Sequence, residues 1–233
     1  MDGMRGMGEQ VIGLLFPRGC AGCDSPDEVL CASCRRLFEC RVSHPLASLL
    51  MGRWHACGWY QGSMRHAILS WKDHGDEECD RPFGDALCRL SKTSGTVAYL
   101  REHASDLPVL VVPAPSSRAS MRRRGRRHMW PVAKRLADYL RAETGLPVVP
   151  CEVLASRGVQ RKSVQMTGVS QRSQRLKGHV AVLPSVALRE RRVILVDDIV
   201  TSGATMRRCV EALRREGAEV VTVLTLAHTP KHA

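Results

Sequence analysis

The stretch from Val193 to Thr205 constrains the fold of this chain more than any other segment. It reads VILVDDIVTSGAT: four apolar residues, two adjacent aspartates, an apolar pair and a hydroxyl-rich turn with one glycine. A short continuous apolar run is typical of a strand buried on both faces, as in parallel sheets. A helix is expected from Ala204 to Glu216, with Gly217 as its C-terminal cap. The segment therefore predicts a strand–loop–helix unit of an α/β fold.

The rest of the C-terminal half follows the same alternation of short apolar runs and longer amphipathic runs. Proline suits the first turn of a helix, and apolar residues recur at four-residue spacing after Pro131. Alternating strands and helices predict a parallel sheet covered by helices on both faces. The expected strands are Val109–Val112, Pro147–Val149, Val193–Val196 and Val220–Leu226, and the expected helix between them is Pro131–Arg141.

The loop after the strand at Val193–Val196 has the composition of a ligand site. α/β proteins bind ligands at the C-terminal ends of their parallel strands. A helix N-terminus offers free N–H groups and a positive dipole end, which suit a phosphate, and Gly203 permits close backbone approach. Asp197 and Asp198 cannot favour the phosphate itself, so we expect them to face sugar hydroxyls and a Mg²⁺ ion. Further hydroxyl donors come from Thr201, Ser202 and Thr205.

A second pattern lies near the N-terminus, where two CxxC pairs follow each other closely. Cys20 and Cys23 form the first pair, and Cys31 and Cys34 form the second. Two such pairs can place four thiolates at the corners of a tetrahedron around Zn²⁺. Four cysteine ligands leave no open position for catalysis, so we expect a structural zinc site. An iron–sulfur cluster and a redox dithiol are the alternatives.

The amino-acid composition indicates the class of protein and the kind of partner that this chain can bind. Hydrophobic residues make up 44% of the 233 residues and charged residues 25%, as in an ordinary globular protein. The apolar stretch at 11–16 is too short for a signal peptide or a membrane helix, so we expect a cytoplasmic protein without membrane insertion. Lysine and arginine total 35 against 23 acids, a net charge of +12, which favours polyanionic partners. The alternative, non-functional explanation of that charge is a proteome that is rich in arginine.

Six arginines lie within ten residues, between the first strand of the core and the helix that follows it. Arginine matches phosphate geometry, singly or in bidentate pairs. One interpretation is a mobile loop that closes over a diphosphate, a second is an electrostatic contact with DNA phosphates, and a third is a solvated charged loop. The arginines are Arg118, Arg122, Arg123, Arg124, Arg126 and Arg127.

The chain divides into three parts by composition. Residues 1–45 hold the cysteine pairs and are expected to form a small zinc-binding module. Residues 46–105 show mixed helical patterning and are expected to form a linker or hood-like helical region. Residues 106–233 carry the alternating strands and helices of the main α/β domain.

The segment at 193–205 resembles the phosphoribosyl pyrophosphate (PRPP) signature of type I phosphoribosyltransferases, position by position. The resemblance implies the type I phosphoribosyltransferase fold, a parallel sheet flanked by helices, here with the N-terminal zinc module added. It also implies Mg²⁺ with PRPP, and it makes Asp197 and Asp198 the catalytic residues, which bind the ribose 2′- and 3′-hydroxyls. The other PRPP-binding residues it implies are Thr201, Ser202, Gly203, Ala204 and Thr205 around the 5′-phosphate, with Ser116, Ser117 and Arg124 toward the diphosphate.

The rest of the chain resembles the ComF/GntX family of phosphoribosyltransferase-like proteins. This resemblance implies a link to DNA uptake and competence, with PRPP or a nucleotide as ligand and with single-stranded DNA and a competence helicase as partners. A non-catalytic nucleic-acid or partner-binding module on the same fold and a nucleobase salvage phosphoribosyltransferase are the alternatives. The similar segments are LLFPRGCAGC at 14–23, the later cysteine pair, the block from Tyr60 to Asp76, VVPAPSSR at 111–118, Arg124-Gly125 and VTVLTLAH at 221–228.

Two departures from the pattern of that family replace neutral side chains with cations. After Arg124-Gly125 the family usually carries an aromatic residue and then Asn-Gln, whereas this chain has Arg126, Arg127 and His128. Arg175 stands where the family usually has asparagine. If these positions contact a nucleobase or a nitrogen nucleophile, the cations argue against the standard transferase activity.

Overall fold

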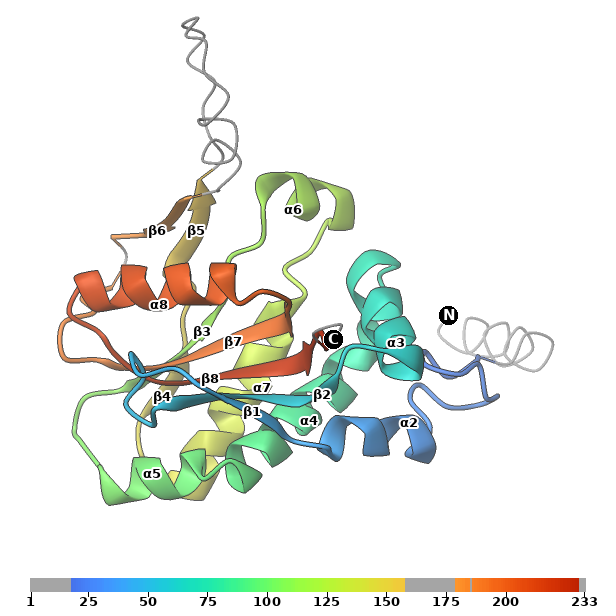
Figure 1. Cartoon of the computed structure of the whole chain (residues 1–233), viewed down its shortest axis with the longest axis horizontal. Helices are drawn as coiled ribbons and strands as arrows, with labels where there is room; N and C mark the ends of the chain where they lie inside the picture. Colours follow the sequence, from blue (N-terminus) through green and yellow to red (C-terminus); the bar gives the residue numbers. More distant parts are fainter. Residues whose placement is uncertain (1–17, 158–178, 185, 231–233) are drawn as a thin grey trace, which may run out of the picture.

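The computed structural model describes residues 18–157, 179–184 and 186–230, arranged around one central sheet (Figure 1). The sheet has six strands in the order β1-β2-β8-β7-β3-β4. Neighbouring strands run parallel except β1, which is antiparallel to β2. The strands are β1 (Val42–Pro45), β2 (Arg53–Trp59), β3 (Val109–Pro113), β4 (Val148–Pro150), β7 (Arg192–Val200) and β8 (Glu219–His228), and a separate antiparallel pair consists of β5 (Leu154–Arg157) and β6 (His179–Val182).

Helices cover both faces of the sheet, as expected for buried parallel strands. One face is covered by α8 (Ala204–Arg215) together with the β5–β6 pair, and the other by α4 (Asp80–Thr93), α5 (Thr96–Glu102) and α7 (Met129–Thr144) (Figure 1). Within the described residues, no helix has the length and apolar character that crossing a bilayer requires. The remaining elements are α2 (Ala32–Arg36), η1 (Leu37–Glu39), α3 (Gly62–Asp73), η2 (Glu77–Cys79) and α6 (Arg118–Arg124).

Strand β7 shows why the apolar run at its start is continuous. Ile194 and Val196 pack into the hydrophobic cluster on the α7 side of the sheet, while Val193 and Leu195 pack into the cluster on the α8 side. All four side chains are fully buried. Because successive residues of a strand point to opposite faces, a strand covered on both sides needs apolar residues at every position. The prediction of a parallel α/β sheet is therefore confirmed.

Element boundaries differ from the predicted ones where tertiary pairing extends them. Strand β7 does not end before the two aspartates but continues to Val200, because β8 pairs alongside it as far as His228. Helix α7 starts two residues before Pro131 and ends at Thr144, so the predicted helix was too short at both ends. The arginine segment contains the short helix α6, not only a loop.

The cysteine-rich region packs directly against the rest of the molecule. Cys20, Leu30 and Cys34 belong to the same buried cluster as the apolar residues of α3, α4 and α7. The sheet likewise takes its β1 and β2 strands from residues 42–59. The division of the chain at 45/46 and 105/106 stays a prediction, and residues 1–17 of the predicted module lie outside the described residues.

Candidate functional site

A hollow of about 190 Å³ lies at the C-terminal edge of the sheet, between the ends of β7 and β3. It brings the predicted phosphate loop, both aspartates and the first residues after β3 into one place. This is the edge at which α/β folds bind their ligands. The residues that line it are Ala114, Pro115, Asp197, Asp198, Ile199, Val200, Thr201, Gly203, Ala204, Thr205 and Met206.

The phosphate loop ends at the start of α8, where Gly203 is the residue before the first helical turn. Its φ of +72° lies in the left-handed region, which favours glycine. A side chain there would also approach the Arg207 guanidinium within 3.0 Å. Arg207 donates a hydrogen bond to the Ser202 carbonyl oxygen at 2.7 Å, so it braces the loop from the helix side. The helix N-terminus consequently faces the hollow with its donors and its positive dipole end.

Asp198 is buried and is held by three hydrogen bonds from this chain. Its Oδ2 accepts from Lys72 Nζ at 2.5 Å and from His128 Nε2 at 2.7 Å. Its Oδ1 accepts from the Ile199 backbone N–H at 2.7 Å. Burial alone raises the pKa of Asp198, but the His128 hydrogen bond and the Lys72 charge outweigh it and hold that pKa below its usual range. Asp198 is therefore ionised, and its carboxylate is hydrogen-bonded within the chain.

Asp197 lies in a different environment although it is the adjacent residue. Strand alternation directs it to the α8 side of the sheet, and its Oδ1 accepts a hydrogen bond from the Asp198 N–H at 2.9 Å. Burial and the negative charge of Asp198 raise the pKa of Asp197 to about 8. The two aspartates thus have opposite pKa shifts, a pattern that is common where carboxylates share a site.

Sequence analysis did not identify Lys72 or His128 as parts of this site. Lys72 lies in the last turn of α3, and His128 directly precedes α7, so both are distant in sequence from Asp198. The rings of His128 and Trp71 form a T-shaped pair, with ring centroids 4.9 Å apart. The one available signal was His128 itself, which stands where the resembled family has a neutral polar residue.

The expected diphosphate residues are placed apart from one another. Ala114 and Pro115 line the hollow, but Ser116 lines a neighbouring cavity of about 510 Å³ that shares those two residues. Ser117 Oγ caps α6 by accepting the Ser120 N–H at 3.1 Å. Arg124 pairs with Asp73 of α3 at 3.1 Å. The structure therefore brings Thr201, Gly203, Ala204 and Thr205 together with both aspartates, while Ser117 and Arg124 have partners in the chain.

The described arginines of the α6 segment fall into two groups. Arg124 and Arg126 are largely buried and join α6 to the neighbouring region, since Arg126 forms ion pairs with Asp80 and Glu77. Arg123 is 67% exposed, and Arg127 is also exposed although it pairs with Glu152. The first group joins α6 to α3 and α4, whereas the second group and the exposed Arg122 present charge to solvent.

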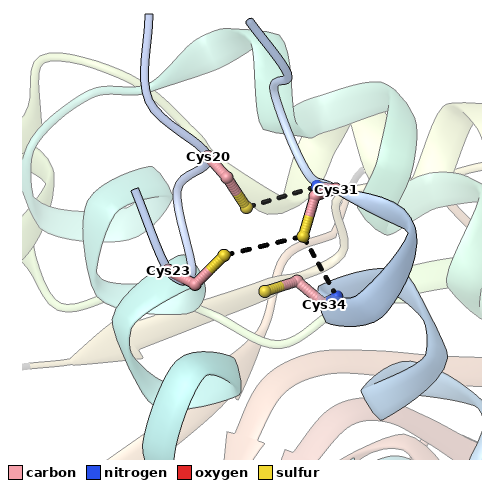
Figure 2. Close-up of side chains that lie close together, drawn as sticks. All are labelled: Cys20, Cys23, Cys31 and Cys34. Atoms are coloured by element: carbon pink, nitrogen blue, oxygen red, sulfur yellow. Dashed lines mark hydrogen bonds between the residues drawn. The ribbon is translucent and has the colours of Figure 1, made fainter. Parts of the chain in front are cut away.

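The four predicted metal ligands converge on one point (Figure 2). The sulfur atoms of Cys20, Cys23, Cys31 and Cys34 all lie within 4.8 Å of one another, and the Cys23 and Cys31 sulfurs are 3.6 Å apart. Zn–S bonds of ~2.3 Å in a tetrahedron imply sulfur–sulfur distances of about 3.8 Å. The four residues thus fit a tetrahedral metal ion.

Backbone N–H groups support this cluster. The Cys31 N–H donates to Cys20 Sγ at 3.2 Å, and the Cys34 N–H donates to Cys31 Sγ at 3.5 Å. Burial raises the pKa of Cys20, but the surrounding backbone N–H groups outweigh it and lower the pKa to about 7. Metals bind the thiolate, so these contacts favour the ligand form of Cys20, whereas burial and the neighbouring sulfurs raise the pKa of Cys34.

Comparisons with known proteins match the C-terminal part of the chain, which contains β7 and α8. A model of the phosphoribosyl transferase domain matches residues 130–233. An orotate phosphoribosyltransferase of Acinetobacter baumannii is 31% identical over 83 residues, which are 36% of this chain and 38% of that protein. One of Bradyrhizobium diazoefficiens is 46% identical over 39 residues, or 17% and 21% of the two chains. This chain therefore spans less than two fifths of the length of these relatives.

Solved structures with a distant likeness carry related titles. One, titled as the allosteric regulatory enzyme of purine biosynthesis, has a TM-score of 0.33 at 21% identity and covers 64% of this chain and 26% of its own. The hypoxanthine-guanine phosphoribosyl transferase of L. donovani has a TM-score of 0.38 at 15% identity, with coverages of 62% and 71%. The predicted fold class, a parallel sheet flanked by helices with a Cys₄ cluster at the N-terminal side, is confirmed by the domain match and the described strands.

Proposed function

We propose, on the premise that residues 130–233 form a phosphoribosyl transferase domain, that this chain binds PRPP with Mg²⁺ and transfers its phosphoribosyl group to a nitrogen nucleophile. One observation carries the proposal: a single hollow is lined by both aspartates, by the residues after β3 and by every residue of the Thr201–Thr205 loop except Ser202. Groups suited to a phosphate, to a sugar and to a diphosphate therefore lie next to one another in this hollow. The acceptor class is a nucleobase, as the printed names of the relatives suggest.

Binding in this hollow would divide the ligand among three elements. The N-terminus of α8 and the hydroxyls of Thr201 and Thr205 would hold the 5′-phosphate. Asp197 would accept the ribose hydroxyls, since the Asp198 oxygens already have partners in the chain. The loop after β3, at Ala114 and Pro115, would face the diphosphate. These contacts orient the sugar and limit the access of water to its C1 atom.

The transfer itself is a substitution at C1 of the ribose. The bond from C1 to the diphosphate oxygen breaks and its electron pair stays on the diphosphate. The lone pair of the acceptor nitrogen forms the new C1–N bond, and the proton that this nitrogen loses passes to water. Because the transition state resembles an oxocarbenium ion, no protein nucleophile is needed, and positioning and charge stabilisation supply the catalysis.

Oxygen ligands near the hollow fit Mg²⁺, which binds through one or two carboxylates together with substrate phosphates. Asp197 is the carboxylate available for this, and PRPP would supply the remaining oxygens. The ion would neutralise charge on the diphosphate. The half-buried Asp197, with a pKa raised to about 8, would ionise more readily beside that cation.

Thermal unfolding with PRPP, in the presence and absence of Mg²⁺, tests this proposal. A ligand that binds only the folded state raises the melting temperature by mass action. We expect a Mg²⁺-dependent rise in the wild type that is lost in Asp197→Asn. The matched control is Asp138→Asn, which removes an exposed carboxylate of α7 that does not line the hollow.

Turnover is then measured as diphosphate release with a panel of pyrimidine and purine bases that includes orotate. No rise in melting temperature in the wild type at millimolar PRPP would refute the proposal. A rise in melting temperature with PRPP, but no diphosphate release in the presence of any base, would support PRPP binding as the function and refute the transfer step.

For the cysteine cluster we propose a structural Zn²⁺ ion. The support is the convergence of four sulfurs, the N–H···S contacts and the absence of a fifth ligand among the described residues. Metal analysis of the purified protein is expected to give one zinc per chain and none in Cys20→Ser/Cys31→Ser. Iron and inorganic sulfide at that site would instead identify a cluster.

A second candidate function is nucleic-acid binding in DNA uptake, in a cytoplasmic ComF-type protein with a helicase partner. It is favoured by the net charge of +12 and by the exposed Arg122, Arg123 and Arg127 of the α6 segment. Its support beyond charge is the family resemblance, part of which, including Arg175, lies outside the described residues.

Single-stranded DNA binding at several salt concentrations separates this candidate from the first. Binding by exposed arginines should weaken steeply with salt, become less salt-dependent in Arg122→Ala/Arg123→Ala, and persist in Asp197→Asn. DNA binding that disappears in Asp197→Asn would place the DNA in the hollow and contradict a separate basic surface.

A further inference from the structure

Lys72 contacts a residue that lines the hollow, and it belongs to a helix that the phosphoribosyl transferase domain match does not include. That match starts at residue 130, whereas Lys72 lies in α3, Gly62–Asp73. Its side chain is 20% exposed and that of Asp198 is 7% exposed. The ammonium group is thus partly exposed and lies within hydrogen-bond distance of Asp198, which lines the hollow, although Lys72 itself is not a lining residue.

The hydrogen bonds of Asp198 show that its main partners are inside the protein. A carboxylate has about four acceptor positions, two on each oxygen. Lys72 and His128 take both positions on Oδ2, and the Ile199 N–H takes one on Oδ1. Little capacity remains for two ribose hydroxyls. Asp198 is therefore suited to position Lys72 rather than to bind the sugar.

The surroundings of Lys72 place it on the diphosphate side of the hollow. His128 follows α6, and α6 follows the loop at the end of β3. Arg124 of α6 pairs at 3.1 Å with Asp73, the neighbour of Lys72, and Arg126 pairs with Asp80 at the start of α4. The end of α3 is consequently fixed against the elements that follow β3, where the diphosphate is expected, as well as against Asp198 of β7.

We propose that Lys72, positioned by Asp198 and His128, binds the diphosphate group of the substrate and stabilises it as it departs. This inference rests on the proposed function and adds a binding residue to it. A lysine ammonium has three donors, and one of them suffices for Asp198. Within the described part of the chain the Lys72 ammonium pairs with Asp198, so two of its N–H donors remain for phosphate oxygens. As C1–O cleavage leaves its electron pair on the diphosphate, the ammonium would offset the growing negative charge.

Three ligands that differ in one group test this assignment. PRPP carries the diphosphate and the 5′-phosphate, inorganic diphosphate carries only the former, and ribose 5-phosphate carries only the latter. We expect Lys72→Ala to weaken the binding of Mg²⁺-PRPP and Mg²⁺-diphosphate by about 10- to 100-fold, as for the loss of a charged hydrogen bond. Binding of ribose 5-phosphate should be unchanged. Lys92→Ala, which removes an exposed lysine of α4, is the matched control for net charge.

Two further variants separate binding from a structural role. Lys72→Arg keeps the charge and should recover most of the diphosphate affinity, which a packing role would not predict. Asp198→Asn should reproduce the selective loss for diphosphate, because the lysine is then no longer held. Equal weakening of all three ligands in Lys72→Ala, or an unchanged affinity for diphosphate, would overturn the assignment. If wild-type protein binds none of the three ligands, the proposed function fails instead.

Discussion

The cysteine cluster and the hollow at the end of β7 are assembled in opposite ways. All four cysteines lie within fifteen residues, and their sulfurs converge through one turn and the short helix α2. The hollow draws Asp197 and Asp198 from β7, Pro115 from the loop after β3, and its Asp198 partners from α3 and the start of α7. A local site can be predicted from spacing, whereas an assembled site depends on how distant segments pack.

The two sites are nevertheless connected through α3. Gly22, between the two cysteines of the first pair, packs so closely that a Cβ atom would lie 2.8 Å from Cys34 Sγ and 2.9 Å from the Ser63 carbonyl oxygen. Arg18 adds an ion pair with Asp76 beyond the other end of α3. The helix that rests on the cysteine cluster at its start therefore carries Lys72 to Asp198 at its end.

Loss of the metal is expected to have the largest effect on stability. In Cys34→Ser the cluster would lose one ligand, and structural metal sites contribute their binding energy to folding. We expect a loss of about 5 kcal/mol or more, which corresponds to a fall of 10 °C or more in the melting temperature. Calorimetry with metal analysis measures both. Cys40→Ser, an exposed cysteine outside the cluster, should melt like the wild type. An unchanged Cys34→Ser variant would show that the cluster is not a structural site.

Breaking the assembled site at Asp198 is expected to come next. Asp198→Asn leaves Lys72 without its counter-ion, and removal of one partner from a buried pair is strongly destabilising. We expect a cost of about 3 kcal/mol, or ~6–12 °C. Chemical denaturation measures it. Double variants with Lys72→Met should cost less than the sum of the single variants, because the two residues interact. Additive effects would contradict the contact.

Gly22→Ala tests whether the cysteine cluster and the hollow are coupled through α3. The added methyl group must displace a sulfur or a backbone carbonyl, which costs about 1–3 kcal/mol, as overpacking does. Gly52→Ala serves as a reference because it strains a left-handed backbone position with nothing within 4 Å of the new atom. Gly22→Ala should additionally weaken diphosphate binding through α3. If both variants behave alike, the cysteine cluster and Lys72 are not coupled.

The pH dependence of stability separates the two aspartates in Mg²⁺-free buffer. Asp197 has a raised pKa of about 8, so the folded state holds a proton that the unfolded state loses between about pH 4 and 8, and stability falls as the pH rises through that range. Asp198 has a lowered pKa and contributes stability above its ordinary pKa that is lost as the pH falls. The melting temperature of Asp197→Asn should thus be higher than that of the wild type near pH 8 and equal to it near pH 4. A constant difference across this range would refute the raised pKa.

The arginine pairs give the smallest expected effects. Arg126→Ala removes a largely buried guanidinium bound to Asp80 and should cost about 1 kcal/mol or slightly more. Arg123→Ala removes an exposed partner of Asp73 and should cost less than ~0.5 kcal/mol. Urea unfolding of both variants measures the difference. Equal costs would mean that burial does not distinguish the two groups of arginines.

Sequence patterns predicted the parts of the fold that depend on local chemistry. The apolar run before Asp197 predicted a strand covered on both faces, and helix α8 begins at Ala204 as expected. The CxxC spacing predicted the cysteine cluster because two-residue gaps allow both sulfurs of a pair to face one ion. In each case the interacting residues are neighbours in the chain, so their spacing carries the information.

Only the tertiary structure decided how the two aspartates differ. Asp197 and Asp198 are chemically identical in the sequence, and the contrast between them comes from which face of β7 each occupies and from Lys72 and His128 on one of those faces. Likewise, the arginine spacing did not reveal that Arg124 and Arg126 pair with Asp73 and Asp80, which only the packing of α6 shows. Charges act through space and depend on burial, so residue type and spacing along the chain could determine the presence of these groups but not their partners or their protonation.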